Sequence, residues 1–149
     1  LLDAAGKYFK KLMKNRPERI ELEIESMEAK VIGDVNQLRF LLENLIDEAL
    51  TVREDGVIRL QARKDNEYIR FLFTDTRREK SVEELNQLFY PNLARMTSGE
   101  KGELRGTEYL VCKQIIRDHD EFAGRRGCRI NAEPAEGGGF TVYFTIPRR

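Results

Sequence analysis

Residues 34–49 read DVNQLRFLLENLIDEA and form the most informative stretch of the chain. Asp34 lies just before an apolar run, and Gln37 comes three residues after Asp34. This is the spacing of a capping box at a helix N-terminus. Apolar side chains then recur every three or four residues, at Leu38, Leu41, Leu42, Leu45, Ile46 and Ala49. They form one face of an amphipathic helix, and we expect this face to pack on a sheet.

The preceding and following segments alternate between helical and strand periodicity. Residues 4–14 place five apolar side chains on one helical face, so they predict a helix that ends before Pro17. Residues 20–24 alternate apolar side chains with glutamates, as in a half-buried strand. Two further alternating runs, at residues 58–62 and 68–73, flank a short polar turn and predict a hairpin.

The middle of the chain combines a short helix with an irregular segment. Ser81 and Glu84 have the spacing of a second capping box and predict a helix over residues 82–89, which Pro91 ends. The polar stretch 97–104 contains two glycines and predicts a mobile loop.

The last third of the chain completes a recognisable order of elements. Residues 106–118 have apolar positions at helical spacing and predict a helix. Strands are expected at residues 128–132 and 140–146, joined through the glycines at 137–139. Together the segments predict an α/β (α+β) two-layer sandwich, a mixed, mostly antiparallel five-stranded sheet with helices on one face.

Composition limits the class of protein. The 149 residues favour one compact domain spanning residues 1–149. Lysine plus arginine total 26 and aspartate plus glutamate total 26, so a broad nucleic-acid surface is excluded and any nucleotide site must be local. No apolar run reaches the roughly eighteen residues of a membrane helix. Because Leu1 opens the chain without a methionine or a signal pattern, we expect a C-terminal fragment of a longer protein.

Two cysteines, Cys112 and Cys128, have neither the spacing of a metal site nor that of a disulfide framework. Cys112 also falls among apolar helical positions. We interpret both as reduced core cysteines of a cytosolic protein.

In its motifs the chain resembles the ATPase domains of sensor histidine kinases, a branch of the GHKL superfamily that shares the Bergerat fold with gyrase and Hsp90. Residues 34–49 are similar to the family's N box, typically DxxxLxxxLxNLxxNA; Asn44 matches the first asparagine and Glu48 replaces the second. Their four-residue spacing puts both side chains on one flank of the helix. The resemblance implies that Asn44 binds nucleotide and that Asn44 and Glu48 hold the Mg²⁺ that bridges the ATP phosphates, for which a carboxylate is a suitable ligand.

Residues 75–79, DTRRE, resemble the family's first glycine box, DxGxG, whose aspartate accepts a hydrogen bond from the adenine amino group. Asp75 keeps that aspartate, whereas Arg77 and Glu79 stand where glycines permit close backbone approach. Residues 88–95, LFYPNLAR, resemble the LFxPFxR segment that precedes the ATP lid. The resemblance therefore implies an adenine contact at Asp75 in a site with altered walls.

Residues 106–119, GTEYLVCKQIIRDH, resemble the second glycine box and its helix, in which Gly106 is kept as a nucleotide-binding residue and Glu108 replaces the second glycine. A carboxylate at a helix N-terminus competes with phosphates for the same N–H groups. Residues 137–147, GGGFTVYFTIP, resemble the family's terminal GxGTxFxxxLP segment. This last match implies Thr141 as a further nucleotide-binding residue.

The only histidine, His119, matches the one that commonly ends this helix in the family. The phosphorylated histidine belongs instead to a separate dimeric helical hairpin that precedes the ATPase domain. We therefore interpret His119 as a structural or surface residue. Between His119 and Gly127 the chain departs from the family's HGGxI pattern by carrying extra residues.

The resemblance also implies where a nucleotide would lie. Adenine is expected near Asp75, and the phosphates between Asn44, Glu48 and the helix start at Gly106. Several glutamates would surround the triphosphate, so a bound divalent cation or the nearby Arg77 and Arg105 are expected beside the phosphates to offset their charge. The sequence thus predicts a weak, metal-dependent complex.

Three functions remain open for such a domain. The first is a degenerate pseudokinase module of a two-component sensor, with weak or no ATP binding. The second is an active catalytic domain that transfers the γ-phosphoryl group of Mg-ATP to a histidine, and the third is another GHKL role such as an anti-sigma-factor kinase. Substitutions concentrate where the phosphates would lie while core positions read normally, which favours the pseudokinase.

The implied cofactors are Mg²⁺ and ATP where binding is retained. The implied partners are the dimerisation and phosphoacceptor helices of the same protein and a response regulator, with no nucleic acid and no membrane contact by this segment. The implied location is the cytoplasm, with or without a membrane anchor elsewhere in the protein.

Overall fold

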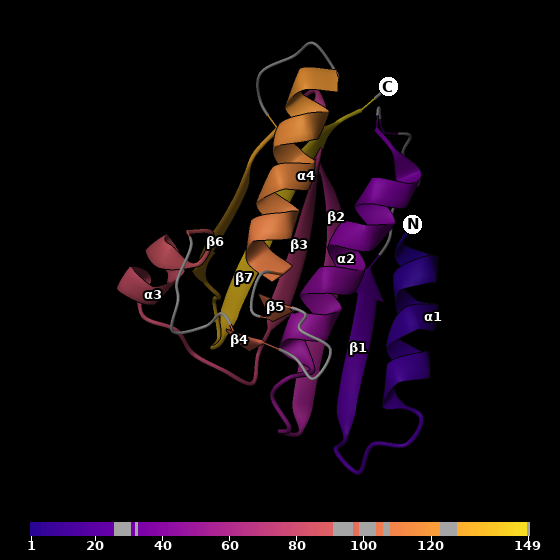
Figure 1. Ribbon diagram of the computed structural model, residues 1–149, viewed down its shortest axis with the longest axis vertical. Coiled ribbons are helices and arrows are strands. Elements are labelled where there is room, and N and C mark those ends of the chain that lie inside the picture. Colours follow the sequence, from indigo (N-terminus) through magenta and orange to yellow (C-terminus); the bar gives the residue numbers. More distant parts are fainter. Residues whose placement is uncertain are drawn as a thin grey trace.

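The computed structural model describes residues 1–25, 31, 33–90, 97–98, 104–105, 108–122 and 128–148. Within these residues a five-stranded sheet lies behind three helices, α1, α2 and α4 (Figure 1). The helices are α1 (Leu2–Met13), α2 (Val35–Ala49), α3 (Val82–Gln87) and α4 (Glu108–Phe122), and the strands are β1 (Ile20–Glu25), β2 (Gly56–Asp65), β3 (Tyr68–Asp75), β4 (Thr97–Ser98), β5 (Leu104–Arg105), β6 (Ile130–Pro134) and β7 (Phe140–Pro147).

The large sheet has the strand order β1-β2-β3-β7-β6. β1 and β2 are parallel because the chain crosses over through α2 between them, and the other neighbouring strands are antiparallel. The β2–β3 hairpin turns at Asn66, whose φ of 57° lies in the left-handed region that asparagine tolerates. The predicted mixed, mostly antiparallel sheet with helices on one face is confirmed.

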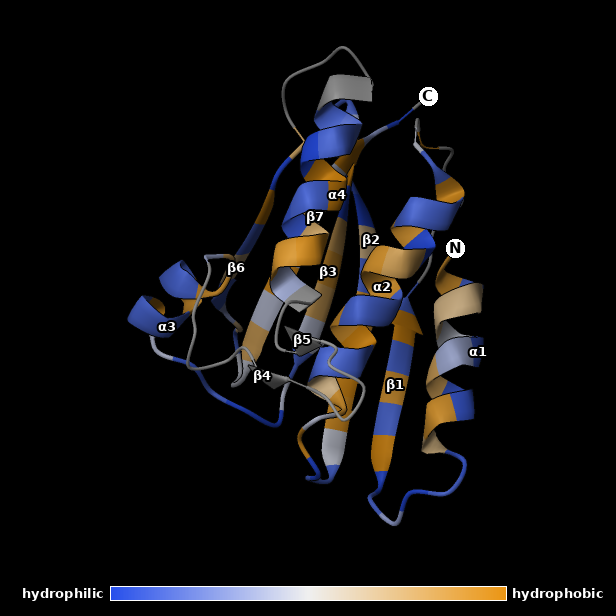
Figure 2. Ribbon diagram, viewed as in Figure 1, coloured by the Kyte–Doolittle hydropathy of each residue, from blue (hydrophilic) through white to orange (hydrophobic). Residues whose placement is uncertain are grey.

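The apolar face of α2 packs on the sheet, as its periodicity predicts. Its fully buried side chains, all 0% exposed, are Leu38, Leu41, Leu42 and Ile46. Figure 2 shows hydrophobic residues along the central strands behind α2 and α4. Among them Phe71 and Phe144 stack with ring centroids 4.9 Å apart. Both cysteines are buried and free, as expected.

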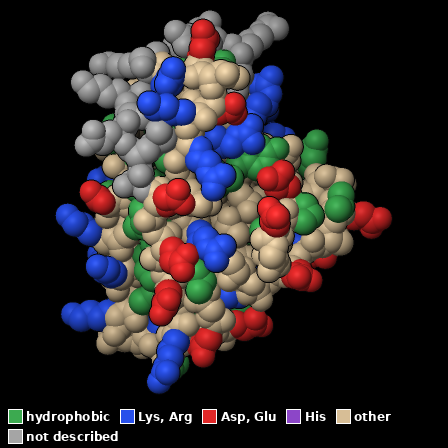
Figure 3. All heavy atoms as spheres, turned by 180° about the vertical axis from the view of Figure 1, so that it is seen from behind, with side chains coloured by type: hydrophobic (Ala, Val, Ile, Leu, Met, Phe, Trp, Pro, Cys, Tyr) green, Lys and Arg blue, Asp and Glu red, His purple; other side chains and the backbone are tan. Residues whose placement is uncertain are grey.

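The far face of the sheet is polar and carries both signs of charge. Figure 3 shows basic and acidic side chains interspersed over this side of the molecule. Cross-strand ion pairs join Arg59 to Glu23 at 3.0 Å and Arg70 to Asp65 at 2.9 Å. None of the described helices combines the length and the apolar character needed to span a lipid bilayer.

The predicted capping box is complete at α3 but only half formed at α2, where the Asp34 backbone N–H donates to Nε2 of His119 instead of to Gln37. The Asp34 carboxylate accepts hydrogen bonds from the backbone N–H groups of Asn36 and Gln37, which caps α2. Ser81 and Glu84 form both bonds of a capping box at the start of α3. α3 ends at Gln87, two residues earlier than expected.

Two further expectations differ from the structure. The stretch 97–104 is expected as a mobile loop, but Thr97–Ser98 and Leu104–Arg105 pair as antiparallel strands; residues 99–103 lie outside the described part. The strand expected at residues 128–132 begins at Ile130, because the backbone N–H of Cys128 donates to the Asp120 carboxylate at 3.1 Å. That bond ties the segment to α4 before the sheet ladder begins.

Candidate functional site

Asp75 is the last residue of β3 and is 2% exposed. It lies between Ile58 of β2 and Phe140 of β7 in the sheet register. Because strand side chains alternate and Phe73 faces the core, the Asp75 carboxylate also points to the helix-covered face. The strand thus delivers a carboxylate into the interior, where an unpaired charge is costly.

Arg77 neutralises this buried carboxylate. Its Nε donates to Oδ1 of Asp75 and its Nη2 donates to Oδ2, each at 2.9 Å, and its backbone N–H donates to Oδ1 at 3.0 Å. The side chains of Arg77 and Asp75 are only 1% and 3% exposed. Two parallel N–H···O bonds between ionised groups are the strongest geometry for such a pair.

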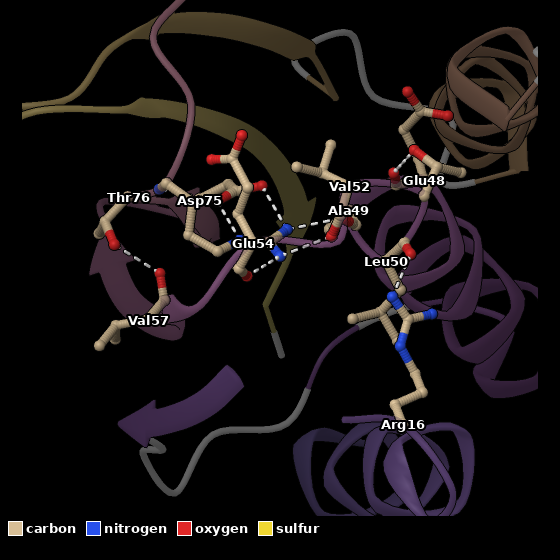
Figure 4. Close-up of polar contacts among 11 residues, drawn as sticks. Arg16, Glu48, Ala49, Leu50, Val52, Glu54, Val57, Asp75 and Thr76 are labelled. Atoms are coloured by element: carbon tan, nitrogen blue, oxygen red, sulfur yellow. Dashed lines mark hydrogen bonds and ion pairs between the residues drawn. The ribbon is translucent and has the colours of Figure 1, made fainter. Parts of the chain in front are cut away.

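The remaining donors of the Arg77 guanidinium are also used. Nη2 donates to the Ala49 carbonyl at 2.6 Å, and Nη1 donates to the Val52 and Glu54 carbonyls at 3.0 and 3.1 Å. Figure 4 shows these three carbonyls and the Asp75 carboxylate converging from α2, the turn after it and β3. Every N–H bond of the guanidinium therefore has an acceptor. The Ala49 carbonyl belongs to the last residue of α2, and the Val52 and Glu54 carbonyls belong to the turn that follows it.

Two glycines make room for this arrangement. Gly56 has a φ of +149°, and a Cβ built there would overlap Cγ of Arg77. Gly139 has a φ of +83°, and a Cβ there would overlap the backbone of Asp75. Glycine at these positions thus permits both the buried arginine and the close approach of the 137–139 turn to β3.

Asn44 and Glu48 lie one turn apart on α2, as predicted, but in different surroundings. Asn44 is 9% exposed, and its Nδ2 donates to the Phe40 carbonyl at 2.7 Å within the helix. Glu48 is half-buried and lines a cavity of about 570 Å³. The other residues that line this cavity are Arg78, Lys80, Glu83, Glu84, Gln87, Leu88 and Tyr109.

The cavity has mixed charge. Three of its lining residues are glutamates and two are basic. Burial raises the pKa of Tyr109 well above its ordinary range, so its hydroxyl stays protonated at neutral pH. Hydrogen bonding to the Ser81 backbone N–H lowers the pKa of Glu84, which keeps that carboxylate ionised. These side chains give the cavity no excess of positive charge to receive a triphosphate.

Thr141 does not converge with Asp75. It lies directly opposite Thr74 in the β3–β7 ladder, and the two hydroxyl oxygens are 2.7 Å apart. Phe140 is the residue opposite Asp75, so alternation places the Thr141 side chain on the other face of the sheet. Gly106 lies outside the described residues.

The predicted site residues are therefore only partly brought together. Among those that the structure describes, Glu48 lines the cavity, whereas Asn44, Asp75 and Thr141 are not part of its lining. No group of three or more histidine, cysteine, aspartate or glutamate side chains is placed to hold a metal within the described part of the chain.

Arg77 differs most from its expected place. The sequence places it beside phosphates, but the structure places its guanidinium on Asp75. An arginine two residues after an aspartate is compatible with either arrangement. The carbonyls of residues 49–54 decide between them, and no short motif signals that they lie beside Asp75.

His119 has a structural role in the interior. It is 4% exposed, its Nδ1 lies 2.8 Å from the Ile115 carbonyl, and its Nε2 accepts the Asp34 backbone N–H at 3.0 Å. A ring that donates from Nδ1 and accepts at Nε2 is a neutral imidazole. His119 thereby fastens α4 to the residue that caps α2.

Comparison with known proteins gives a consistent assignment. Residues 33–149 match the model of the family described as "Histidine kinase-, DNA gyrase B-, and HSP90-like ATPase". The mycobacterial sensor histidine kinase MprB superposes with a TM-score of 0.73 at 18% identity, over 99% of this chain and 94% of that one. The catalytic domain of the histidine kinase ThkA gives 0.72 at 20% identity, over 99% and 92%.

A larger relative shows the same fold within a longer chain. Full-length ShkA, solved with AMPPNP, gives a TM-score of 0.70 at 17% identity, over 98% of this chain and 29% of its own. No curated protein sequence matches the chain. The family model spans most of the chain, so the protein belongs to the histidine kinase-, DNA gyrase B- and HSP90-like ATPases, and its fold is the one seen in the catalytic domains of histidine kinases.

Proposed function

We propose that this domain is a degenerate pseudokinase module of a two-component sensor, which binds ATP weakly or not at all. One observation carries the proposal: the only described candidate for recognising adenine, Asp75, has both carboxylate oxygens engaged by Arg77. An adenine amino group would need one of these oxygens as its acceptor. The nucleotide must therefore displace a buried arginine before it can bind.

The free energies involved favour Arg77 over adenine as the partner of Asp75. Separating a buried ion pair costs about 3–5 kcal/mol, because it leaves a charge without a partner. A hydrogen bond from the adenine amino group to an ionised carboxylate returns only about 1.5–3 kcal/mol. The deficit of up to about 3.5 kcal/mol corresponds to an affinity weakened by as much as about 300-fold.

The phosphate side of the site supports the same proposal. The Asn44 side-chain amide donates an N–H to the Phe40 carbonyl. Glu48 adds a negative charge to a cavity that is already lined by Glu83 and Glu84. Glu79, in place of a glycine, is exposed. The described residues thus do not fit Mg-ATP well, and we assign no catalytic step to them.

The partners are proposed by analogy with relatives. ThkA has been solved in complex with the response regulator TrrA, and this chain covers 40% of the ThkA chain in that complex. We infer that the present domain docks on dimerisation and phosphoacceptor helices of its own protein, and that a response regulator is a further partner. In this role the fold transmits conformational change without phosphoryl transfer.

A second candidate function rests on Glu48. This side chain lines the cavity and is a suitable oxygen ligand for Mg²⁺, which favours a weak but active Mg-ATP-dependent kinase domain. Such a domain would bind nucleotide only with the metal present. It would also phosphorylate its own phosphoacceptor helices when these are supplied.

Calorimetric titration with Mg-ATP and with ADP separates the two candidates. The pseudokinase should give no binding, or a dissociation constant above about 100 μM. A matched variant restores the family residues, with Arg77, Glu79 and Glu108 changed to glycine and Glu48 changed to asparagine, and it should bind more tightly. Submicromolar binding of Mg-ATP by the natural sequence would overturn the pseudokinase proposal.

A further inference from the structure

The acceptors around Arg77 form one continuous cluster. We call the Asp75 carboxylate and the carbonyls of Ala49, Val52 and Glu54 the acceptor cluster (Figure 4). Its five hydrogen bonds all point at a single planar group. Four residues from α2, the following turn and β3 thus form one site, and the guanidinium of Arg77 occupies it.

The chemistry of the cluster selects its occupant. The cluster offers acceptors only, and one of them is ionised. The edge of adenine presents an acceptor nitrogen beside its amino group, so part of that edge would face another acceptor. A guanidinium presents donors in every in-plane direction and carries the compensating positive charge.

A compact ammonium ion would fit less well. Its donors radiate from one nitrogen atom, whereas the acceptors here contact three different nitrogens of one plane. The site also lies at the C-terminal end of α2, where the helix dipole favours a cation. A second arginine supports this preference, because Nη2 of Arg16 donates to the neighbouring Leu50 carbonyl at 2.8 Å.

We propose that the acceptor cluster is a guanidinium-binding site that Arg77 occupies from within. The site recognises the guanidinium class of cation, and Arg77 is its tethered ligand. Once vacated, it takes a free guanidinium or a small alkylguanidinium. The proposal goes beyond the loss of ATP binding, since it assigns the pocket a new specificity, and it does not require that nucleotide binding is absent.

Chemical rescue tests the proposal on the full chain. The Arg77→Ala variant should melt below the natural protein, and up to about 20 mM guanidinium chloride at constant ionic strength, far below denaturing concentrations, should raise its midpoint saturably. A rise of at least about 2 °C is expected. Urea and sodium ions at the same concentration should have no such effect.

Two control variants define specificity. Arg53→Ala removes an arginine whose side chain is 66% exposed, and guanidinium should not stabilise it. Adding Asp75→Asn to Arg77→Ala removes the charge of the cluster and should abolish the rescue. Equal stabilisation of the Arg53 and Arg77 variants, or rescue that survives without the Asp75 charge, would overturn the proposal.

A second measurement uses the natural protein and does not depend on a variant that folds. In ¹⁵N NMR the Arg77 Nε–H should exchange with water at least about tenfold more slowly than that of Arg53, because every donor of its guanidinium is bonded inside the protein. Equal exchange rates would contradict an occupied site. Tight ATP binding would refute the pseudokinase proposal, whereas failure of rescue and of slow exchange refutes this one.

Discussion

The pairing of Asp75 with Arg77 can be measured as a coupling free energy in a double-mutant cycle. Changing Arg77 to methionine removes the positive charge and both guanidinium bonds from the buried Asp75 carboxylate, which keeps only the backbone N–H of residue 77. Three carbonyls also lose a donor, so we expect a loss of about 3–5 kcal/mol in the free energy of unfolding. For a chain of this size that loss lowers the melting midpoint by roughly 6–20 °C. Asp75→Asn and the double variant complete the cycle.

The coupling free energy should reach at least about 2 kcal/mol, because two charge-assisted bonds join side chains that are 1% and 3% exposed. Urea unfolding of the four proteins, with the slopes compared for two-state behaviour, gives the value. The matched control is the surface pair Arg59–Glu23, with side chains 46% and 56% exposed, where about 0.2–1 kcal/mol is expected. A buried coupling no larger than the surface coupling would refute the assigned role of Arg77.

Three further predictions concern the core, the thiols and the last turn. Leu45→Ala should cost about 2–5 kcal/mol by urea unfolding, whereas Val35→Ala, at a side chain 62% exposed, should stay within about 0.5 kcal/mol; similar values would mean that the face of α2 is misassigned. Burial raises the pKa of Cys128 from 9.0 to about 11, so the contribution of its protonated thiol to stability is intact below pH 9 and is lost as the pH rises to 11. Across that range the free energy of unfolding should fall while the rate of iodoacetamide labelling rises. Gly139→Ala should lower the melting midpoint more than Gly137→Ala, because both have positive φ but only the former would overlap backbone; equal losses would show that strain alone matters.

Local patterns predicted the parts of the fold that depend on neighbouring residues. The leucine periodicity of residues 38–49 fixed the buried face of α2, and Ser81 with Glu84 fixed the start of α3. The face of Thr141 was also readable, since Phe140 and Val142 alternate with it as core residues. A motif match alone had grouped it with Asp75.

The partner of Asp75 was not readable from local pattern. The position of Arg77 depends on carbonyls more than twenty residues earlier, and these approach β3 only when α2 packs on the sheet. Gly56 leaves room for the Arg77 side chain because it has no Cβ, but in the sequence it looks like an ordinary turn residue. Tertiary geometry, with no sequence periodicity of its own, decides such a contact.

The parallel pairing of β1 with β2 has a consequence for how the domain assembles. Ile20 meets Gly56 in this ladder, whereas the β2–β3 hairpin joins residues as close as Asp65 and Tyr68. Closing the longer loop costs more chain entropy before any contact forms, so the edge strand joins after the hairpin. β1 and β6 are the two edge strands of the sheet, and by the same reasoning we expect β1 to detach first while the antiparallel ladders of β2, β3, β7 and β6 remain paired.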